Sequence, residues 1–193
     1  MICKIISVDD EQRDLDFRTV RSRLQDKGYK PDIVQQELQA KGYRLVGFIQ
    51  FGGFLNGIIL KVEKEGVYYA VKTYEREKLR DAEETMIRRE AVSLGKHCWH
   101  PFIVTAKETF HTEKHVFMVL EFCEKGDMFE AVVNAIKIGK CKKTKVKEAA
   151  PYYIGVDSEL VKRTMASLLL ILDYFSSEGI VYRDLKPENV LLS

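Results

Sequence analysis

Four polar residues stand close together near the end of this 193-residue chain, between two apolar runs. They are Arg183, Asp184, Lys186 and Asn189, within the segment 181–193. Buried polar groups need partners, so such a cluster suits a loop better than a core segment. Such a loop could position a hydroxyl and a metal-bound phosphate.

A second candidate for chemistry is Lys72, which follows Ala70 in an otherwise apolar, β-prone run. A lysine in a strand commonly buries its stem and leaves its head in solvent. Among the acids of the following amphipathic segment, Glu83 and Glu84 fit a solvated helix face, whereas Glu90 stands next to Ala91 on the apolar side.

A third feature is the glycine-rich stretch Gly52-Gly53-x-x-x-Gly57, which lies between two β-prone runs. Because glycine has no Cβ, backbone amides in such a turn can approach phosphate oxygens. A plain hairpin turn is the commoner explanation of the same pattern.

Together these segments resemble the eukaryotic protein kinases. Residues 181–193 match the catalytic-loop pattern His/Tyr-Arg-Asp-x-Lys-x-x-x-Asn. The lysine, the glutamate, the phrase starting at His100-Pro101 and a hinge-like run precede it in the kinase order. Lys-Pro-Glu after Leu185 is similar to serine/threonine kinases, and Tyr182 together with the His-Pro-Phe phrase is similar to the AGC group. The resemblance covers about residues 43 to 193.

The resemblance implies transfer of the γ-phosphoryl group of ATP to a Ser or Thr hydroxyl of a protein substrate, assisted by Mg²⁺. Asp184 would accept or orient the proton of the attacking hydroxyl, and Lys186 would neutralise charge on the transferred group. Asn189 would hold a magnesium ion. Lys72 would contact the α- and β-phosphates and pair with a glutamate of the next helix. Glu90, eighteen residues after Lys72, is the matching acid, and Glu83 and Glu84 are alternatives.

The resemblance also implies a set of residues that bind the nucleotide: Ile49, Gly52, Gly53, Ile58, Ala70, Lys72, Leu120, Glu121, Cys123, Asp127 and Leu191. Ile58 would lie against adenine, Leu120 would guard the back pocket, and Leu191 would form the floor. Asp127 matches the ribose-binding acid, and it equally suits a helix N-cap. The glycine-rich turn departs from Gly-x-Gly-x-x-Gly-x-Val, which implies looser covering of the phosphates.

The expected fold is α+β and protein-kinase-like, with a five-stranded antiparallel N-lobe sheet, one regulatory helix and the first helices of a truncated helical C-lobe. The expected strands are 45–51, 58–62, 67–74, 103–110 and 116–122, and the expected regulatory helix is 75–94. The expected domain is 43–193, with its N-lobe at 43–120, its hinge at 121–127 and the start of its C-lobe at 128–193. One C-lobe helix should follow Asp127, and a longer one should follow Asp157 or Ser158 and end at Gly179.

Residues 1–42 are expected to form a helical extension. Two segments in it end alike, Leu-Gln-Asp-Lys-Gly-Tyr at 24–29 and Leu-Gln-Ala-Lys-Gly-Tyr at 38–43. Each is typical of a helix that is stopped by its glycine, Gly28 or Gly42. Packing of this extension on the following domain is favoured over a recognition element.

Composition excludes several other classes of function. The net charge of +2 gives no overall attraction to nucleic acid or to an anionic membrane. The six lysines of 137–147 lack interleaved aromatic residues and indicate a solvated loop or an insertion. No apolar run is long enough to span a bilayer, and the segment 97–100 lacks the paired spacing of a zinc site. Four cysteines without a Cys-x-x-Cys pair favour the cytoplasm, with the nucleus also open.

In the kinase pattern a metal-binding Asp-Phe-Gly segment follows the catalytic loop, whereas this sequence ends at Ser193. Two hypotheses follow. The chain is the N-terminal portion of an active kinase, or it is a truncated relative that binds nucleotide or regulates a partner without phosphotransfer. On either hypothesis, we expect this chain alone to be weakly active or inactive.

Overall fold

The computed structural model of the chain describes residues 3–5, 17–52, 55, 57–96, 100–141 and 157–193. It contains two compact units. The first consists of residues 12–100 and 104–122, and the second of residues 1–11, 101–103 and 123–193.

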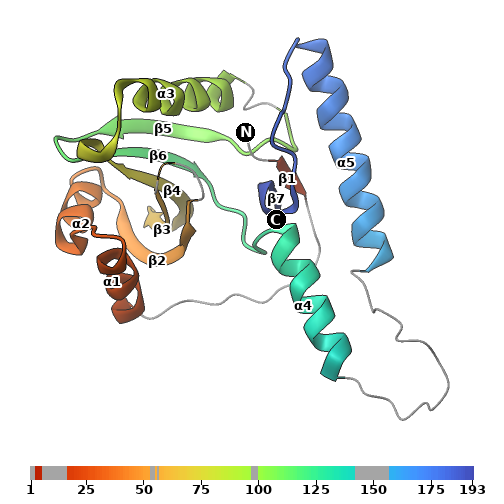
Figure 1. The fold of residues 1–193 in the computed structure, drawn as a ribbon, viewed down its shortest axis with the longest axis horizontal. Helices are drawn as coiled ribbons and strands as arrows, with labels where there is room; N and C mark the ends of the chain where they lie inside the picture. The colour runs from red at the N-terminus through yellow and green to blue at the C-terminus, as the bar shows by residue number, and fades with distance from the viewer. Residues whose placement is uncertain (1–2, 6–16, 53–54, 56, 97–99, 142–156) are drawn as a thin grey trace. The chain divides into compact units, whose positions relative to one another are not determined.

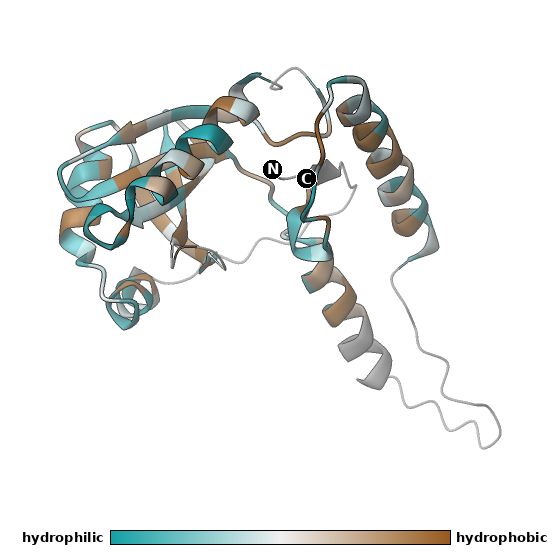
Figure 2. Ribbon diagram, turned by 45° about the horizontal axis from the view of Figure 1, so that its top comes forward, coloured by the Kyte–Doolittle hydropathy of each residue, from teal (hydrophilic) through white to brown (hydrophobic). Residues whose placement is uncertain are grey.

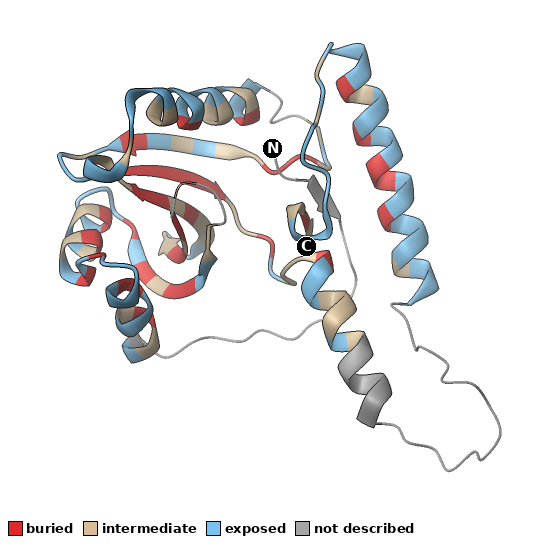
Figure 3. Ribbon diagram, in the orientation of Figure 1, coloured by how far each residue is buried: buried red, intermediate tan, exposed pale blue. Residues whose placement is uncertain are grey.

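A five-stranded antiparallel sheet forms the body of the first unit, in the order β2-β3-β4-β6-β5. The strands are β2 (Arg44–Phe51), β3 (Ile58–Lys64), β4 (Val67–Glu75), β5 (Ala106–His111) and β6 (His115–Glu121). This confirms the predicted sheet, although β5 begins three residues later than expected. β3, β4 and β6 hold most of the buried positions, as Figure 3 shows in red.

Two short helices precede the sheet, α1 (Phe17–Asp26) and α2 (Pro31–Gln39). Both stop where the sequence predicts, because Gly28 and Gly42 adopt φ angles of 81° and 83°. In each case the amide of the next tyrosine reaches back to a leucine carbonyl, at 3.0 Å for Tyr29 and for Tyr43. The two repeated segments are therefore the same helix-ending motif, used twice.

The main core of the first unit lies between these two helices and one face of the sheet. Helices α1 and α2 contribute Val20, Leu24, Val34 and Leu38, each fully buried. The sheet contributes Leu45, Phe48, Ile58, Leu60, Val62, Val71, Phe110, Phe117 and Val119. In Figure 1 both helices lie beside β2. Helices α1 and α2, which precede residue 43, therefore share one hydrophobic core with the sheet that follows it.

The segment after β4 differs from the single helix that the sequence predicted. A short 3₁₀ turn, η1 (Arg76–Lys78), comes first, and α3 (Asp81–Lys96) follows. Leu79 lies between them in an extended conformation, with φ −94° and ψ 135°. The Glu83 carboxylate accepts a hydrogen bond of 2.8 Å from the amide of Arg80 and so caps the start of α3. The distribution of charged residues does not reveal this boundary between η1 and α3, because polar residues run through the whole segment.

The second unit contains α4 (Met128–Cys141), α5 (Ser158–Ser177), η2 (Pro187–Asn189) and two short strands, β1 (Cys3–Ile5) and β7 (Val190–Leu192). Asp127 caps α4 by accepting a hydrogen bond of 2.8 Å from the amide of Glu130. Asp157 caps α5 through the amide of Leu160 at 3.1 Å, which decides between the two predicted caps.

The strand pair β1–β7 was not predicted. Its strands are parallel, with Cys3 opposite Val190 and Ile5 opposite Leu192. Residues 3–5 were expected to belong to a helical extension, whereas they form a strand of the second unit. A three-residue strand whose partner lies at the other end of the sequence leaves no local pattern to recognise.

Helix α5 has more apolar surface than its unit covers. Leu168, Ile171 and Phe175 are buried, whereas Met165 and Leu169 are more than half exposed. Figure 2 shows apolar residues along most of this helix. Even so, no helix among the described residues is long and apolar enough to cross a membrane.

Candidate active site

Lys72 of β4 and Glu90 of α3 form an ion pair, with 2.7 Å between the lysine Nζ and the carboxylate Oε1. Both side chains are largely covered, at 15% and 27% exposure. The two alternative acids bind elsewhere. Glu83 pairs with Arg80 at the start of α3, and Glu84 pairs with arginines at positions 76 and 88. The helix thus presents Glu90, and neither of its rivals, to the lysine.

The environment of Glu90 makes its charge depend on Lys72. Burial raises the pKa of the Glu90 carboxyl, but nearby positive charge, chiefly the ammonium of Lys72 with its hydrogen bond, outweighs burial. The pKa therefore lies below the ordinary value, and Glu90 is ionised at neutral pH.

The sheet register shows which residues share the face of Lys72. In an antiparallel sheet, directly opposite residues point to the same side. Lys72 lies opposite Ile59 on β3 and Met118 on β6, and Ala70 lies opposite Leu120. Three of the predicted nucleotide-binding residues, Ala70, Lys72 and Leu120, therefore share one face of the sheet.

The expectation for Ile58 was wrong. Ile58 lies opposite Thr73, on the other face from Lys72, and it is fully buried in the core beneath α1 and α2. Its neighbour Ile59 takes the position opposite Lys72. The register depends on the turn at Glu65 and Gly66, whose positive φ angles of 55° and 78° fit a type I′ hairpin. A shift of one residue exchanges the faces of a strand, so counting along the sequence was not sufficient.

The glycine-rich turn is closed by its own backbone. The amide of Gly52 donates a hydrogen bond of 2.8 Å to the carbonyl of Gly57, so this amide is already engaged and is not free for a phosphate oxygen. Gly53 lies outside the described residues. Ile49 precedes the turn on β2, is 39% exposed, and lies where the β2–β3 register shifts.

Tyr74 is a residue of this region that the sequence analysis missed. A Cβ on Gly57 would lie 2.6 Å from Cε1 of the Tyr74 ring, so the ring occupies the space that a side chain would need. Tyr74 is two residues from Lys72 and shares its face of β4. Burial raises the pKa of the Tyr74 hydroxyl, and the nearby Glu90 carboxylate raises it further. Only the strand register, which the sequence does not specify, places Tyr74 against the turn.

Within the second unit, Asp184, Lys186 and Asn189 form a cluster of their own. The Nζ of Lys186 lies 3.1 Å from Oδ2 of Asp184. The side-chain amide of Asn189 donates to the same oxygen and to the Asp184 carbonyl, each at 2.8 Å. The hydrogen bonds from Lys186 and Asn189 hold the pKa of the Asp184 carboxyl below its usual range. Asp184 is therefore an anion near neutral pH, and 68% of its side chain is exposed.

The backbone around this cluster is fixed at both ends. Tyr182 stacks on Phe175 of α5, with ring centroids 5.8 Å apart. Arg183 has a positive φ of 65°, which is uncommon outside glycine and marks a sharp change of direction just before Asp184. Strand β7 follows η2, and its Leu191 forms an isolated antiparallel bridge with Asp127.

The predicted hinge residues are partly engaged by the protein itself. The amide of Glu121 donates to the carbonyl of Thr105 at 3.0 Å. Cys123 is buried. The Asp127 carboxylate caps α4, which is one of the two roles that the sequence left open.

The side chains present fit a magnesium ion that is held mainly by phosphates. No group of three or more His, Cys, Asp or Glu that could hold a metal occurs among the described residues. Mg²⁺ commonly takes one or two protein oxygens, with phosphate and water oxygens completing its shell. Because the Asn189 nitrogen is bound to Asp184, its Oδ1 is the atom left to act as a ligand. The Asp184 carboxylate lies directly beside it.

Comparison with known proteins shows the family. Residues 45–193 match the protein kinase domain family, which is most of the chain. The chain belongs to this family.

Several curated proteins are similar to this member of the family. A cAMP-dependent protein kinase catalytic subunit from Schizosaccharomyces pombe is 32% identical over 141 residues, which cover 73% of this chain and 24% of that protein. A putative ribosomal protein S6 kinase alpha-1 from Caenorhabditis elegans is 31% identical over 167 residues, covering 86% of this chain and 18% of that protein. A negative regulator of sexual conjugation and meiosis from S. pombe is 28% identical over 164 residues, covering 84% and 31%. This chain therefore spans less than a third of the length of these relatives.

Proposed function

We propose that this kinase-family chain binds ATP with Mg²⁺ and serves transfer of the γ-phosphoryl group to Ser or Thr hydroxyls of proteins. The ion pair between Lys72 and Glu90 carries the proposal. A covered lysine that is fixed by a carboxylate has a defined position for its ammonium, and a fixed cation stabilises phosphate charge without reorganising. The similarity to the cAMP-dependent and S6 kinases supports serine/threonine substrates.

The proposed roles follow from the state of each side chain. Lys72 binds the α- and β-phosphates, while Ala70, Ile59 and Leu120 offer apolar contacts to adenine on the same face of the sheet. Asp184, held ionised by its neighbours, accepts the hydrogen bond of the attacking hydroxyl. Lys186 lies beside it and balances negative charge on the transferred group. Magnesium, when bound through Asn189, would neutralise phosphate charge.

Binding of nucleotide tests the first half of this proposal. The midpoint of thermal unfolding of the full chain is measured with increasing ATP and Mg²⁺. Saturating ligand at about 100 times Kd stabilises by ~2.7 kcal/mol, an effect that is easily measured. The Lys72→Met variant should lose most of this shift, whereas Lys107→Met, on exposed β5, should keep it. An equal shift in both variants would contradict the assignment of Lys72.

A second candidate function is nucleotide binding or regulation without phosphotransfer. The glycine-rich turn favours it, because the Gly52 amide is engaged and the space beside Gly57 is filled by Tyr74. Both features reduce the backbone that can reach the phosphates. Incubation with γ-labelled ATP and a mixture of Ser/Thr peptides separates the two candidates. Thermal stabilisation by ATP without peptide labelling supports the second function, and labelling that Asp184→Asn abolishes supports the first.

A further inference from the structure

The repeated motif at the ends of α1 and α2 makes two different kinds of contact. Each copy places a buried tyrosine on the sheet side of its helix end, Tyr29 in the first and Tyr43 in the second. Each ring also has a lysine Nζ over it, from Lys78 at 5.7 Å and from Lys64 at 4.6 Å. Both copies therefore carry a buried tyrosine with a lysine over its ring, and they differ in the residues that the tyrosine contacts.

The first copy holds the backbone next to Lys72. The hydroxyl of Tyr29 donates a hydrogen bond of 3.1 Å to the carbonyl of Thr73. The ring of Tyr29 stacks on His115 at 5.8 Å, and His115 in turn pairs with Glu37 of α2 at 2.5 Å. This contact is well buried, since Tyr29 and His115 are each 3% exposed. Helices α1 and α2 are thereby attached to β4 at the residue that follows Lys72.

The first copy also reaches η1, which connects β4 to α3. Lys78, which lies over the Tyr29 ring, belongs to η1 and donates to the carbonyl of Lys27 at 3.4 Å. Both contacts fall on the nineteen-residue segment whose two ends are Lys72 and Glu90.

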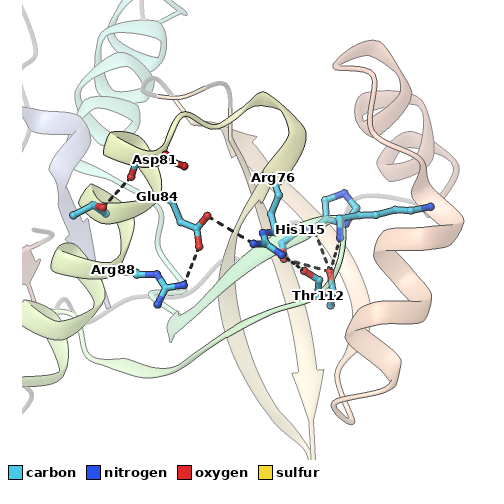
Figure 4. Close-up of polar contacts among 8 residues, drawn as sticks. Arg76, Asp81, Glu84, Arg88, Thr112 and His115 are labelled. Carbon is cyan, nitrogen blue, oxygen red and sulfur yellow. Dashed lines mark hydrogen bonds and ion pairs between the residues drawn. The ribbon is translucent and has the colours of Figure 1, made fainter.

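The β5–β6 turn holds the same segment by a second set of polar contacts (Figure 4). Arg76 of η1 donates from its side chain to the carbonyl of Thr112 at 3.0 Å, and from its amide to the carbonyl of Lys114 at 2.8 Å. Its guanidinium also lies 3.9 Å from the Glu84 carboxylate on α3, which in turn binds Arg88 at 2.9 Å. The β5–β6 turn therefore holds η1 on one side, and the segment between α1 and α2 holds it on the other.

The second copy of the motif contacts other parts of the sheet. The Tyr43 hydroxyl donates to the carboxylate of Glu108 on β5. Its ring packs edge-on against Tyr69 and stacks on Phe110, with centroids 5.8 Å and 6.4 Å away. Lys64, over the ring, lies on β3. None of these partners lies between Lys72 and Glu90.

We propose that helices α1 and α2 form a positioning element for the Lys72–Glu90 pair, and that Tyr29 is its positioning residue. By fixing the Thr73 carbonyl and η1, the first copy of the motif sets where β4 ends and where α3 begins. The second copy attaches the helices to the sheet without this effect. The consequence for ATP rests on the proposed function, whereas the effect on the ion pair does not.

The experiment compares Tyr29→Phe with Tyr43→Phe in the full chain, since each loses one buried hydroxyl and keeps its ring. The readout is the rate at which an amine-reactive acylating reagent modifies Lys72, followed by mass spectrometry. An ammonium held in an ion pair reacts slowly. Tyr29→Phe should raise the rate at Lys72 about fivefold, and Tyr43→Phe should change it less than twofold, at similar midpoints of unfolding. Equal rates at Lys72 in both variants would overturn the proposal.

A second pair of variants repeats the comparison without altering either tyrosine. Lys78→Met should raise the reactivity of Lys72, and Lys64→Met should not. Measuring ATP-dependent thermal stabilisation on the same variants separates the two proposals. If Tyr29→Phe exposes Lys72 but the unmodified chain shows no response to ATP, the positioning role stands and the nucleotide function fails. If ATP stabilises the unmodified chain and Tyr29→Phe leaves Lys72 protected, the positioning role fails alone.

Discussion

Lys72 and Glu90 lie eighteen residues apart in the chain, yet their charged groups are 2.7 Å apart and mostly shielded from water. Strand β4 carries Lys72 and α3 carries Glu90, so the ion pair depends on the relative position of these two elements. Removing either charge leaves the other without compensation in a covered site.

The Lys72→Met variant should raise the pKa of Glu90 above the ordinary glutamate value, because burial remains and the ammonium is gone. We expect a loss of about 2 kcal/mol in unfolding free energy at pH 7, the scale of a hydrogen bond to a charged group. In the unmodified chain the lowered pKa of Glu90 adds stability above the unfolded-state pKa, and this is lost as pH falls through the folded-state value. The difference between the two proteins should therefore shrink towards acid, as urea unfolding at several pH values can measure. A constant difference from pH 7 to pH 3 would contradict the assignment.

Replacing Gly57 by alanine should destabilise the first unit by about 1–3 kcal/mol, because the new Cβ would lie 2.6 Å from the Tyr74 ring and 3.3 Å from the Thr73 carbonyl. Adding Tyr74→Leu should recover part of the loss, because it removes the ring that the Cβ meets. Gly95→Ala is the control: nothing lies within 4 Å of its added Cβ, and in helix α3 it should stabilise by about 0.5–1 kcal/mol. Chemical denaturation checks all three, and an additive double variant would argue against direct contact between residues 57 and 74.

The Lys186→Met variant should raise the pKa of Asp184, since the hydrogen bond from Lys186 is the largest cause of its lowering. If the chain transfers phosphate as proposed, the acidic limb of its pH–rate profile should move to higher pH in this variant. NMR titration of the Asp184 carboxyl measures the same shift without any turnover. Arg163→Met, which breaks an exposed ion pair on α5, should leave the titration of Asp184 unchanged.

Leu38→Ala should cost about 2–5 kcal/mol of stability although residue 38 precedes the part of the chain that matches the kinase family. The reason is that Leu38 is fully buried in the core that α2 shares with the sheet. Gln39→Ala, on the exposed side of the same helix end, should change the unfolding free energy by less than about 0.5 kcal/mol. Thermal unfolding of both variants provides the measurement. Comparable midpoints would mean that residues 17–42 are dispensable to the core.

Local chemistry predicted much of this structure. The glycines at 28 and 42 end their helices because positive φ angles are accessible there, and Asp127 caps α4 because a carboxylate binds free helix amides. The succession of strands along the chain followed from β-prone runs separated by turns, and the choice of Glu90 followed from the resemblance to kinases. Each of these depends on a short segment or on a motif with fixed spacing.

The misses share one cause, which is register between distant strands. Ile58 and Ile59 are equally apolar, and only the hairpin turn decides which of them lies beside Lys72. Tyr74 was overlooked for the same reason, since its role depends on lying opposite Gly57. Strand β1 depends on a partner near the far end of the chain. Such pairings are set by the whole fold, and a single sequence does not reveal them.

Strand β4 sends Lys72 towards one side of the sheet and Thr73 towards the other, where Tyr29 binds its carbonyl. The strand thus separates the Lys72 ammonium, which must be placed accurately, from the packed core of α1, α2 and the sheet, which can place it. A library of all substitutions at residues 67–75 would show this as an alternation from one position to the next. Successive positions would be sensitive in turn to charge and to side-chain volume, so a defect in the Lys72–Glu90 pair and a defect in folding could be told apart by whether the position is even or odd.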